Sequence, residues 1–189
     1  MRTKETSCGG QTGFTLVEVM VAVCVLAILL GVAIPRFERL IEKARLKSIG
    51  ADFLVDLQLA RSEAIVRGRR VALCAAASSE ACSPKGDWTS GWMLFVDSNN
   101  NGSREIGELV LRYHTAVPPG WRVAGNRPVS RYISYNGLGA TRLTSGAFQA
   151  GTVTVCKIAS NSKEAIKVVI NSVGRPRMEL SRYIECEAG

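Results

Sequence analysis

The sequence predicts an α+β fold in which one long N-terminal helix packs on an antiparallel β-sheet domain. Three observations predict it. An unbroken apolar run occupies residues 14–34 except for one carboxylate, and apolar residues then recur every three or four positions to about residue 66. From residue 69 onward, short apolar or alternating segments are separated by Gly, Pro, Asn and Ser. A helical period followed by a strand period predicts a helix laid across a sheet.

The composition is that of one globular domain with an appended segment. The chain has 189 residues, of which 47% are hydrophobic and 21% are charged, which is enough apolar material for a core. The net charge of +8 predicts attraction to polyanions, either nucleic acid or an acidic membrane surface. Charge alone does not decide between them.

The apolar run is long enough to cross a membrane. Its 21 residues would extend about 31 Å as a helix at ~1.5 Å per residue. The preceding flank carries Arg2, Lys4 and Glu5 and is typical of the cytoplasmic side of a membrane helix. An ordinary secretory signal has a shorter apolar stretch followed by small residues, whereas here the small residue Gly13 precedes the run.

The junction Gly13-Phe14-Thr15-Leu16-Val17-Glu18 resembles the prepilin signal of type IV pilins and type II secretion pseudopilins. The resemblance implies that a prepilin peptidase cleaves between Gly13 and Phe14 and that the new N-terminal Phe14 is methylated. The chain has 24 basic and 16 acidic side chains, of which the leader holds two and one, so the mature chain would carry +7.

Glu18 is the only charged residue in the apolar run, and a carboxylate in hydrocarbon costs a few kcal/mol unless it is paired. The resemblance implies that Glu18 of one subunit meets the Phe14 amine of its neighbour during filament assembly. The alternative is a simple signal anchor whose Glu18 reaches the lipid headgroups.

We therefore expect a leader peptide at 1–13, a transmembrane half of the helix at 14–35, an amphipathic half at 36–67 and a β-rich periplasmic domain at 68–189. Pro35 should kink the helix rather than end it, and Gly68 is a plausible end. The apolar stripe beyond Pro35 consists of Phe37, Leu40, Ile41, Ala44, Leu46, Ile49, Phe53, Leu57, Ala60 and Ala64.

Six segments have the pattern of antiparallel strands: 69–76, 91–97, 108–115, 131–137, 151–159 and 164–172. With the N-terminal helix, this layout resembles the GspH/FimT family of minor pilins and pseudopilins, which implies the pilin fold. The Asn- and Gly-rich segment 95–111 is similar to a hairpin that the family often carries.

Four of the six cysteines lie in the β-rich domain, where an oxidising periplasm would allow disulfides. Four cysteines allow three connectivities. Cys74–Cys82 with Cys156–Cys186 is preferred because each pair closes its own segment. A zinc site would need more closely spaced pairs such as C-x-x-C, and the sequence contains none. The other two, Cys8 and Cys24, are interpreted as small apolar residues.

Asp97, Asn99, Asn101, Gly102 and Glu108 match the spacing of an EF-hand calcium loop. The flanks of this segment are strand-like rather than helical, and Arg104 brings positive charge into it. An Asn-Gly hairpin turn is therefore the preferred interpretation.

Enzyme signals are poor, and no cofactor is expected. The chain has one histidine, His114, with no nucleophile motif around it, and it lacks P-loop, Rossmann and Gly-x-Ser-x-Gly patterns. The three tryptophans, Trp88, Trp92 and Trp121, are interpreted as packing residues of the core or sheet.

Near the C-terminus, Gly174, Arg175, Pro176 and Arg177 form a basic turn. Gly174 permits a positive φ, Pro176 stiffens the backbone, and guanidinium groups form bidentate bonds with phosphate. The segment resembles a Gly-Arg-x-Arg element with which FimT-type minor pilins bind DNA. Further basic residues could extend the patch: Lys157, Lys163, Lys167 and Arg182.

These features predict a minor type IV pilin that binds double-stranded DNA without sequence preference and supports uptake in natural transformation. The alternative is a structural subunit that primes or caps a type IV pilus or a type II secretion pseudopilus without binding DNA. Either subunit would be a single-pass inner-membrane protein that assembles into a filament. Its partners would be other pilin subunits and the prepilin peptidase.

Overall fold

A computed structural model describes residues 13–158, 164–182 and 186. A single helix, α1 (Leu16–Arg67), precedes eight strands: β1 (Val71–Ala75), β2 (Gly91–Val96), β3 (Val110–Thr115), β4 (Trp121–Gly125), β5 (Tyr132–Tyr135), β6 (Gly151–Lys157), β7 (Glu164–Ile170) and β8 (Pro176–Arg182). Short 3₁₀ turns, η1 (Trp88–Ser90) and η2 (Arg127–Val129), join some of them. The chain divides into two compact units, residues 1–43 and 44–189.

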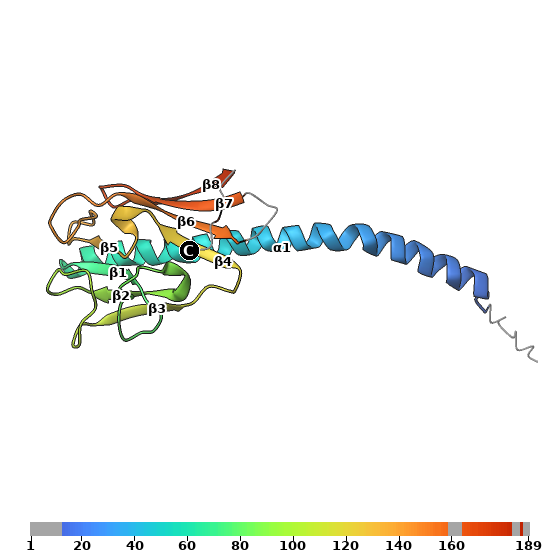
Figure 1. The fold of residues 1–189 in the computed structure, drawn as a ribbon, viewed down its shortest axis with the longest axis horizontal. Helices are drawn as coiled ribbons and strands as arrows, with labels where there is room; N and C mark the ends of the chain where they lie inside the picture. The colour runs from blue at the N-terminus through green and yellow to red at the C-terminus, as the bar shows by residue number, and fades with distance from the viewer. Residues whose placement is uncertain (1–12, 159–163, 183–185, 187–189) are drawn as a thin grey trace, which may run out of the picture. The chain divides into compact units, whose positions relative to one another are not determined.

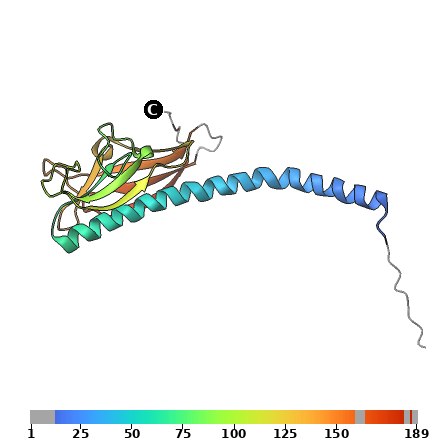
Figure 2. The same cartoon turned by 90° about the horizontal axis from the view of Figure 1, so that it is seen from below.

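The strands form two four-stranded antiparallel sheets, where the sequence had predicted one. The first has the order β3-β2-β1-β5 and the second β4-β6-β7-β8 (Figure 1). Seen from below, both sheets lie on the same side of the 44–67 part of α1 (Figure 2). The expected α+β class, with a long helix followed by antiparallel strands, is confirmed.

Residues next to each end of helix α1 define where it starts and stops. The Thr15 hydroxyl accepts the Glu18 backbone N–H at 3.3 Å, and the Thr15 N–H donates to a Glu18 carboxylate oxygen at 3.5 Å. This reciprocal pair is a capping box. At the other end, Gly68 has a φ of 61°, the left-handed conformation that commonly follows the last helical residue.

The buried stripe of α1 starts later than the sequence predicted. Its members from Leu46 onward are all buried: Leu46, Ile49, Phe53, Leu57, Ala60 and Ala64. Phe37, Leu40 and Ile41, however, are 49–63% exposed. These three residues belong to the first compact unit, 1–43, whereas the buried members of the stripe belong to the second, 44–189.

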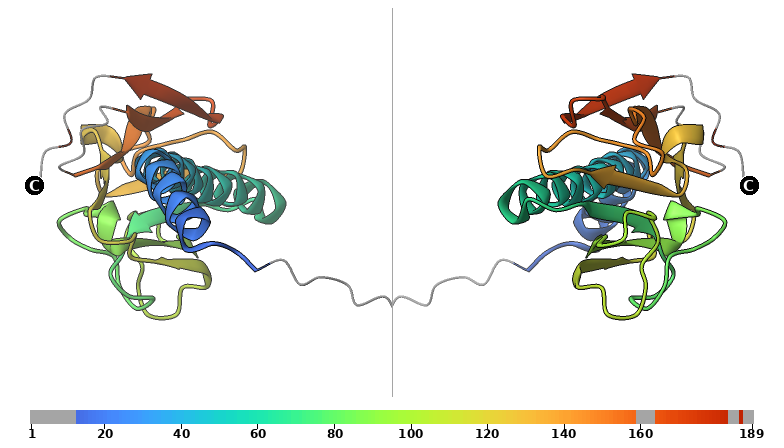
Figure 3. Two further views of the ribbon diagram at one scale, coloured as in Figure 1. Left: turned by 90° about the vertical axis from the view of Figure 1, so that its right-hand side faces the viewer. Right: turned by 90° about the vertical axis from the view of Figure 1, so that its left-hand side faces the viewer.

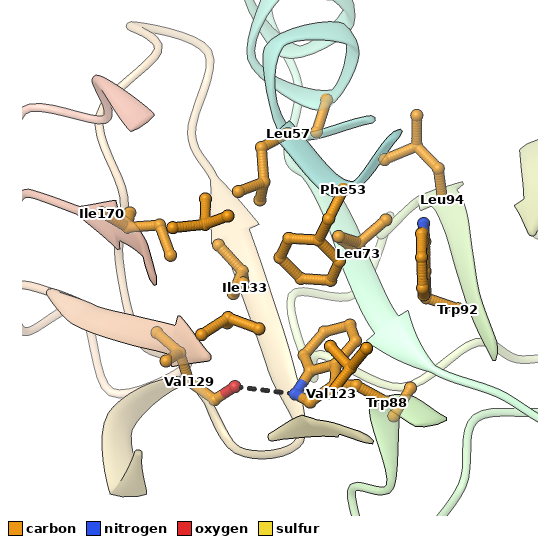
Figure 4. Packing of buried hydrophobic residues seen from close by; sticks show 14 of the residues in the cluster. Phe53, Leu57, Leu73, Trp88, Trp92, Leu94, Val123, Val129, Ile133 and Ile170 are labelled. Atoms are coloured by element: carbon orange, nitrogen blue, oxygen red, sulfur yellow. Dashed lines mark hydrogen bonds between the residues drawn. The ribbon is translucent and has the colours of Figure 1, made fainter. Parts of the chain in front are cut away.

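Phe53 lies at the centre of the core that α1 shares with both sheets (Figure 4). Its ring meets Trp88 and Trp92 edge-on at centroid distances of 5.2 and 5.1 Å. The Trp88 indole N–H donates to the Val129 carbonyl at 3.0 Å, which satisfies the polar group of a fully buried ring. The expectation that the tryptophans are packing residues is confirmed, since Trp121 is also buried.

A buried carboxylate attaches α1 to the β2–β3 hairpin. Asp56 is 2% exposed and accepts the Trp92 indole N–H at 2.7 Å and an Arg112 N–H at 3.0 Å. Such a group is tolerated in a core only when it is hydrogen-bonded. His114 stacks on Trp92 at 4.0 Å, with Nε2 3.9 Å from a carboxylate oxygen of Asp52.

All six predicted strand segments contain a strand, but β4 and β8 were not predicted. Strand β8 alternates apolar and polar residues, which is a strand period, but residues 174–177 were predicted as a basic turn and most of the strand is exposed. It is an edge strand and lies on the outer side of the second sheet (Figure 3). Pro176 is its first residue, a position that does not require a backbone donor.

Two disulfides join segments of the second unit. Cys74 pairs with Cys82 and Cys156 with Cys186, with Cα–Cα distances of 5.7 and 5.9 Å. The Cys74–Cys82 bridge ties the segment after β1 back to that strand, and the second bridge attaches the C-terminal segment to β6. Cys24 is a free, exposed cysteine, and Cys8 lies outside the described residues.

Candidate functional site

Two regions gather the residues that the sequence singled out. The first is the start of α1, where Gly13, Phe14 and Glu18 are all exposed. Among the described residues, α1 is the one helix long and apolar enough to cross a membrane. The large apolar side chains from Phe14 to Leu30 are about half or more exposed.

The second region is the turn between β7 and β8, which Asn171 organises. The Asn171 carbonyl accepts the Gly174 N–H at 2.9 Å and the Thr141 hydroxyl at 2.8 Å. The Asn171 side chain accepts the Arg175 N–H at 2.8 Å. These bonds hold the backbone before Arg175 in one conformation without using its guanidinium group.

Gly174 is required at this turn for two reasons. Its φ is 77°, where an L side chain is strained, and a Cβ there would collide with the carbonyl of Gly139. The same Gly139 carbonyl accepts the Arg61 Nε–H at 3.0 Å. The turn at 171–175 therefore packs on a second turn to which a residue of α1 is also bonded.

Gly174→Ala is expected to lower the free energy of unfolding by roughly 2–4 kcal/mol, because strain and collision with Gly139 add together. Gly146→Ala is the matched control, since Gly146 also has a positive φ, 85°, but open space around it. It should lose only about 1 kcal/mol. Urea unfolding followed by fluorescence of the buried tryptophans measures both, and equal losses would show that the contact with Gly139 is unimportant.

The two arginines of the basic segment differ in their surroundings. Arg175 is exposed in the turn. Arg177, predicted to lie in the loop, is instead the second residue of β8. Its Nε lies 2.6 Å from the carboxylate of Glu179, and its side chain is 58% exposed. The ion pair partly neutralises Arg177, so Arg175 carries the unpaired charge of this turn.

The strand register separates the other basic residues that could have joined the patch. Lys167 pairs with Glu179 and Val169 with Arg177 across β7 and β8, so Lys167 and Arg177 share the outer face. The other two belong to the opposite face. Lys157 shares a face with the buried Val155 of β6, and Arg182 shares a face with the buried Ile166 of β7. Lys163 lies outside the described residues.

The segment proposed as an alternative calcium loop joins β2 to β3. Asp97 is 1% exposed and accepts the N–H groups of Asn101 and Gly102, both at 3.0 Å. Burial raises the pKa of Asp97, although these two bonds lower it. The Glu108 carboxylate accepts the Ser98 and Glu105 N–H groups at 2.8 and 2.9 Å.

Asn101 in turn donates its side-chain N–H to Glu105 at 2.7 Å, as does Asn99 at 3.0 Å. The oxygens of this loop thus bind its own N–H groups, which accounts for its shape without a cation. Across the described residues, no group of three or more His, Cys, Asp or Glu side chains is placed to hold a metal ion.

Sequence reasoning missed one residue beside the basic turn. Arg61, on α1, lines a surface pocket together with Arg175. In the sequence, Arg61 is one of several charges on an amphipathic helix, and no local signal distinguishes it. Only its bond to Gly139 and the packing of the 171–175 turn bring it next to Arg175.

Comparisons with known proteins agree with this architecture. The family described as Type II transport protein GspH matches residues 50–174, and the prokaryotic N-terminal methylation motif matches residues 8–34. No protein of curated function matches the sequence.

Solved structures of minor pilins share the fold. The chain is similar to the type IV minor pilin FimU of Pseudomonas aeruginosa, with 19% identity, a TM-score of 0.52 and coverage of 77% of this chain and 92% of FimU. The minor pseudopilin EpsH of the Vibrio cholerae type 2 secretion system has 13% identity, a TM-score of 0.48 and coverage of 73% and 97%.

The family match spans most of the globular unit, and the methylation motif spans the start of α1, on a chain with the pilin arrangement of helix and sheets. The chain therefore belongs to the family described as Type II transport protein GspH, carries the N-terminal methylation motif and has the fold of the minor pilin FimU.

Proposed function

We propose that the protein is a structural subunit that is cleaved after Gly13, methylated at Phe14 and anchored in the inner membrane by the first half of α1 until it enters a filament. The observation that carries this proposal is the methylation motif at the start of a helix whose apolar residues are left exposed. An exposed apolar helix of this length needs either lipid or neighbouring helices around it.

Glu18 is the residue proposed to direct assembly. In the uncleaved chain its carboxylate belongs to the capping box with Thr15, which satisfies part of its hydrogen-bonding capacity within one subunit. Cleavage would create a charged amine on Phe14, four residues away in the sequence. A carboxylate and an amine from adjacent subunits would then pair in hydrocarbon, where an unpaired charge costs several kcal/mol.

Mass spectrometry of the mature protein tests the processing step. The expected N-terminal residue is Phe14 with one added methyl group on its amine, and no peptide from residues 1–13 should remain. A mature chain that begins at Met1, or that has lost the apolar run, would contradict the proposal. Gly13→Val should block cleavage and leave the full-length chain in the membrane fraction, because the peptidase is expected to need the small residue.

A second candidate function, DNA binding, is favoured by the basic turn. Arg175 is exposed, unpaired by any described acid and held on a rigid backbone by Asn171 and Gly174. Rigid presentation reduces the entropy lost on binding, and guanidinium groups suit phosphate oxygens. The ion pair between Arg177 and Glu179 opposes this function, because binding would have to displace it.

Titration of a fluorescent duplex with the full mature chain in a neutral detergent tests this candidate. Phosphate contacts carry no sequence information, so duplexes of unrelated sequence should bind equally. With few cations involved, the affinity should be on the order of micromolar or weaker and should fall as salt rises. No binding at low salt would leave the subunit with a structural role alone.

A further inference from the structure

A pocket of about 340 Å³ opens between the last turns of α1 and the start of β8. It is lined by Gln58, Arg61, Ser62, Ile65, Arg175 and Pro176. Two arginines and a glutamine line it together with the apolar side chains of Ile65 and Pro176, and the Ser62 hydroxyl donates to the Leu59 carbonyl at 2.9 Å. No acidic residue lines this pocket, and its volume falls within the range of about 300–1,000 Å³ that is usual for small-ligand sites.

The guanidinium group of Arg61 makes one hydrogen bond to the described residues, which fixes its position. Its Nε donates to the Gly139 carbonyl at 3.0 Å, which anchors the guanidinium group and leaves four further N–H donors on its two terminal nitrogens. No described acceptor binds them. Within the electrostatic reach of Arg61, the Tyr135 hydroxyl is buried and also lacks a partner among the described residues.

The nearby acids are engaged elsewhere. Glu63 pairs with Arg67 at 2.7 Å, and Asp56 is buried against Trp92 and Arg112. The pocket therefore has two basic residues and no acidic residue in its lining, an arrangement that attracts anions.

We propose that this pocket is a phosphate-binding site in which Arg61 and Arg175 hold one phosphate group between them. Two guanidinium groups can each donate two parallel hydrogen bonds to phosphate oxygens. Gln58 supplies an additional donor on one side, and the apolar wall of Ile65 and Pro176 suits the carbon atoms of an attached sugar. The phosphate is supplied by a nucleic-acid backbone or by the free ion.

The nucleic-acid source rests on the DNA-binding candidate above, and it extends that site from the β7–β8 turn onto α1. The free ion tests the pocket separately. Two experiments on the full mature chain in neutral detergent therefore distinguish a wrong pocket from a wrong function.

The first experiment compares the thermal unfolding of the chain in inorganic phosphate and in chloride of equal ionic strength. A ligand that binds only the folded state raises the unfolding temperature, so phosphate should raise it by a few degrees. Arg61→Gln and Gln58→Glu should each remove this rise. Gln58→Glu breaks no bond seen in the structure, because Gln58 is exposed, and it places a carboxylate at the pocket wall.

Lys47→Gln is the matched control. It lowers the net charge by one, as the two pocket variants do, and Lys47 is an exposed residue of the same helix outside the pocket. It should keep the full phosphate response. A parent chain whose unfolding temperature does not respond to phosphate, or a response that Lys47→Gln loses equally, would overturn the proposal.

The second experiment repeats the duplex titration with these variants. Arg61→Gln and Gln58→Glu should weaken DNA binding about five-fold, and Arg61→Gln should reduce the salt slope by about one, as expected when one phosphate contact is lost. Lys47→Gln should change the affinity less than two-fold.

A parent chain that responds to phosphate but binds no DNA would support the pocket and refute the DNA function. DNA binding and phosphate response that are both unaffected by Arg61→Gln and Gln58→Glu would refute the pocket. If these variants instead lost only filament incorporation, the pocket would be a contact between subunits, and the proposal would be wrong.

Discussion

Glu18→Ala is expected to reduce incorporation of the subunit into filaments by at least about ten-fold, since a factor of ten needs only about 1.4 kcal/mol and an unpaired charge in hydrocarbon costs more. Cleavage after Gly13 should continue, because the small residue and the apolar run are unchanged. Without the carboxylate, the Phe14 amine of the neighbouring subunit would enter the filament core with no counter-charge. The amount of subunit in purified filaments, or in complexes purified with other subunits, measures the effect.

Two further variants separate assembly from helix capping. Thr15→Val removes the hydroxyl that accepts the Glu18 N–H but keeps the carboxylate. It should cost about 1 kcal/mol of helix stability and leave incorporation close to that of the parent. Glu18→Asp should incorporate partially, because its shorter side chain retains the charge. Filaments with parental amounts of Glu18→Ala would show that the carboxylate has no role in assembly.

Arg175→Ala combined with Arg177→Ala is expected to abolish most DNA binding at fixed salt. Each arginine should contribute about one unit to the dependence of log affinity on log salt, so the slope should fall by about two. The unfolding temperature should hardly change, because both side chains are exposed and the ion pair of Arg177 with Glu179 lies at the surface, where such pairs contribute little.

Single substitutions at this turn are expected to change DNA affinity in both directions. Arg175→Lys should bind between the parent and the double variant, because an ammonium group cannot make the bidentate contact. Glu179→Gln should strengthen binding, since it releases Arg177 from its partner. A double variant that binds DNA as well as the parent would show that the basic turn is not the binding site.

Local periodicity and local chemistry encode the features that could be predicted from the sequence. The extent of α1 follows from an unbroken apolar run, a Thr15–Glu18 capping box and Gly68 beyond the last turn. Six strands could be predicted because their segments are apolar or alternate in the sequence, from β1 and β2, which are buried throughout, to β3, which is only partly buried. The motif at Gly13–Glu18 identified the class of protein for the same reason, since all its residues are adjacent in the chain.

Features that depend on partners distant in sequence could be read only from the folded structure. The strands divide into two sheets because β4 pairs with β6 and β1 with β5, and no local pattern encodes these choices. Strand β8 has an apolar–polar period in the sequence, but the same residues also suit a basic turn, and only their pairing with β7 makes them a strand.

The grouping of basic residues around Arg175 also depends on tertiary contacts. Basic residues close to Arg175 in the sequence are divided between two faces of a sheet, because strand register alternates their directions. Arg61, far away in the sequence, instead lines a pocket with Arg175. It does so because Gly139 accepts its hydrogen bond and Gly174 packs against the same carbonyl. Local sequence encodes each of these turns, but only the packing of one on the other brings the two arginines together.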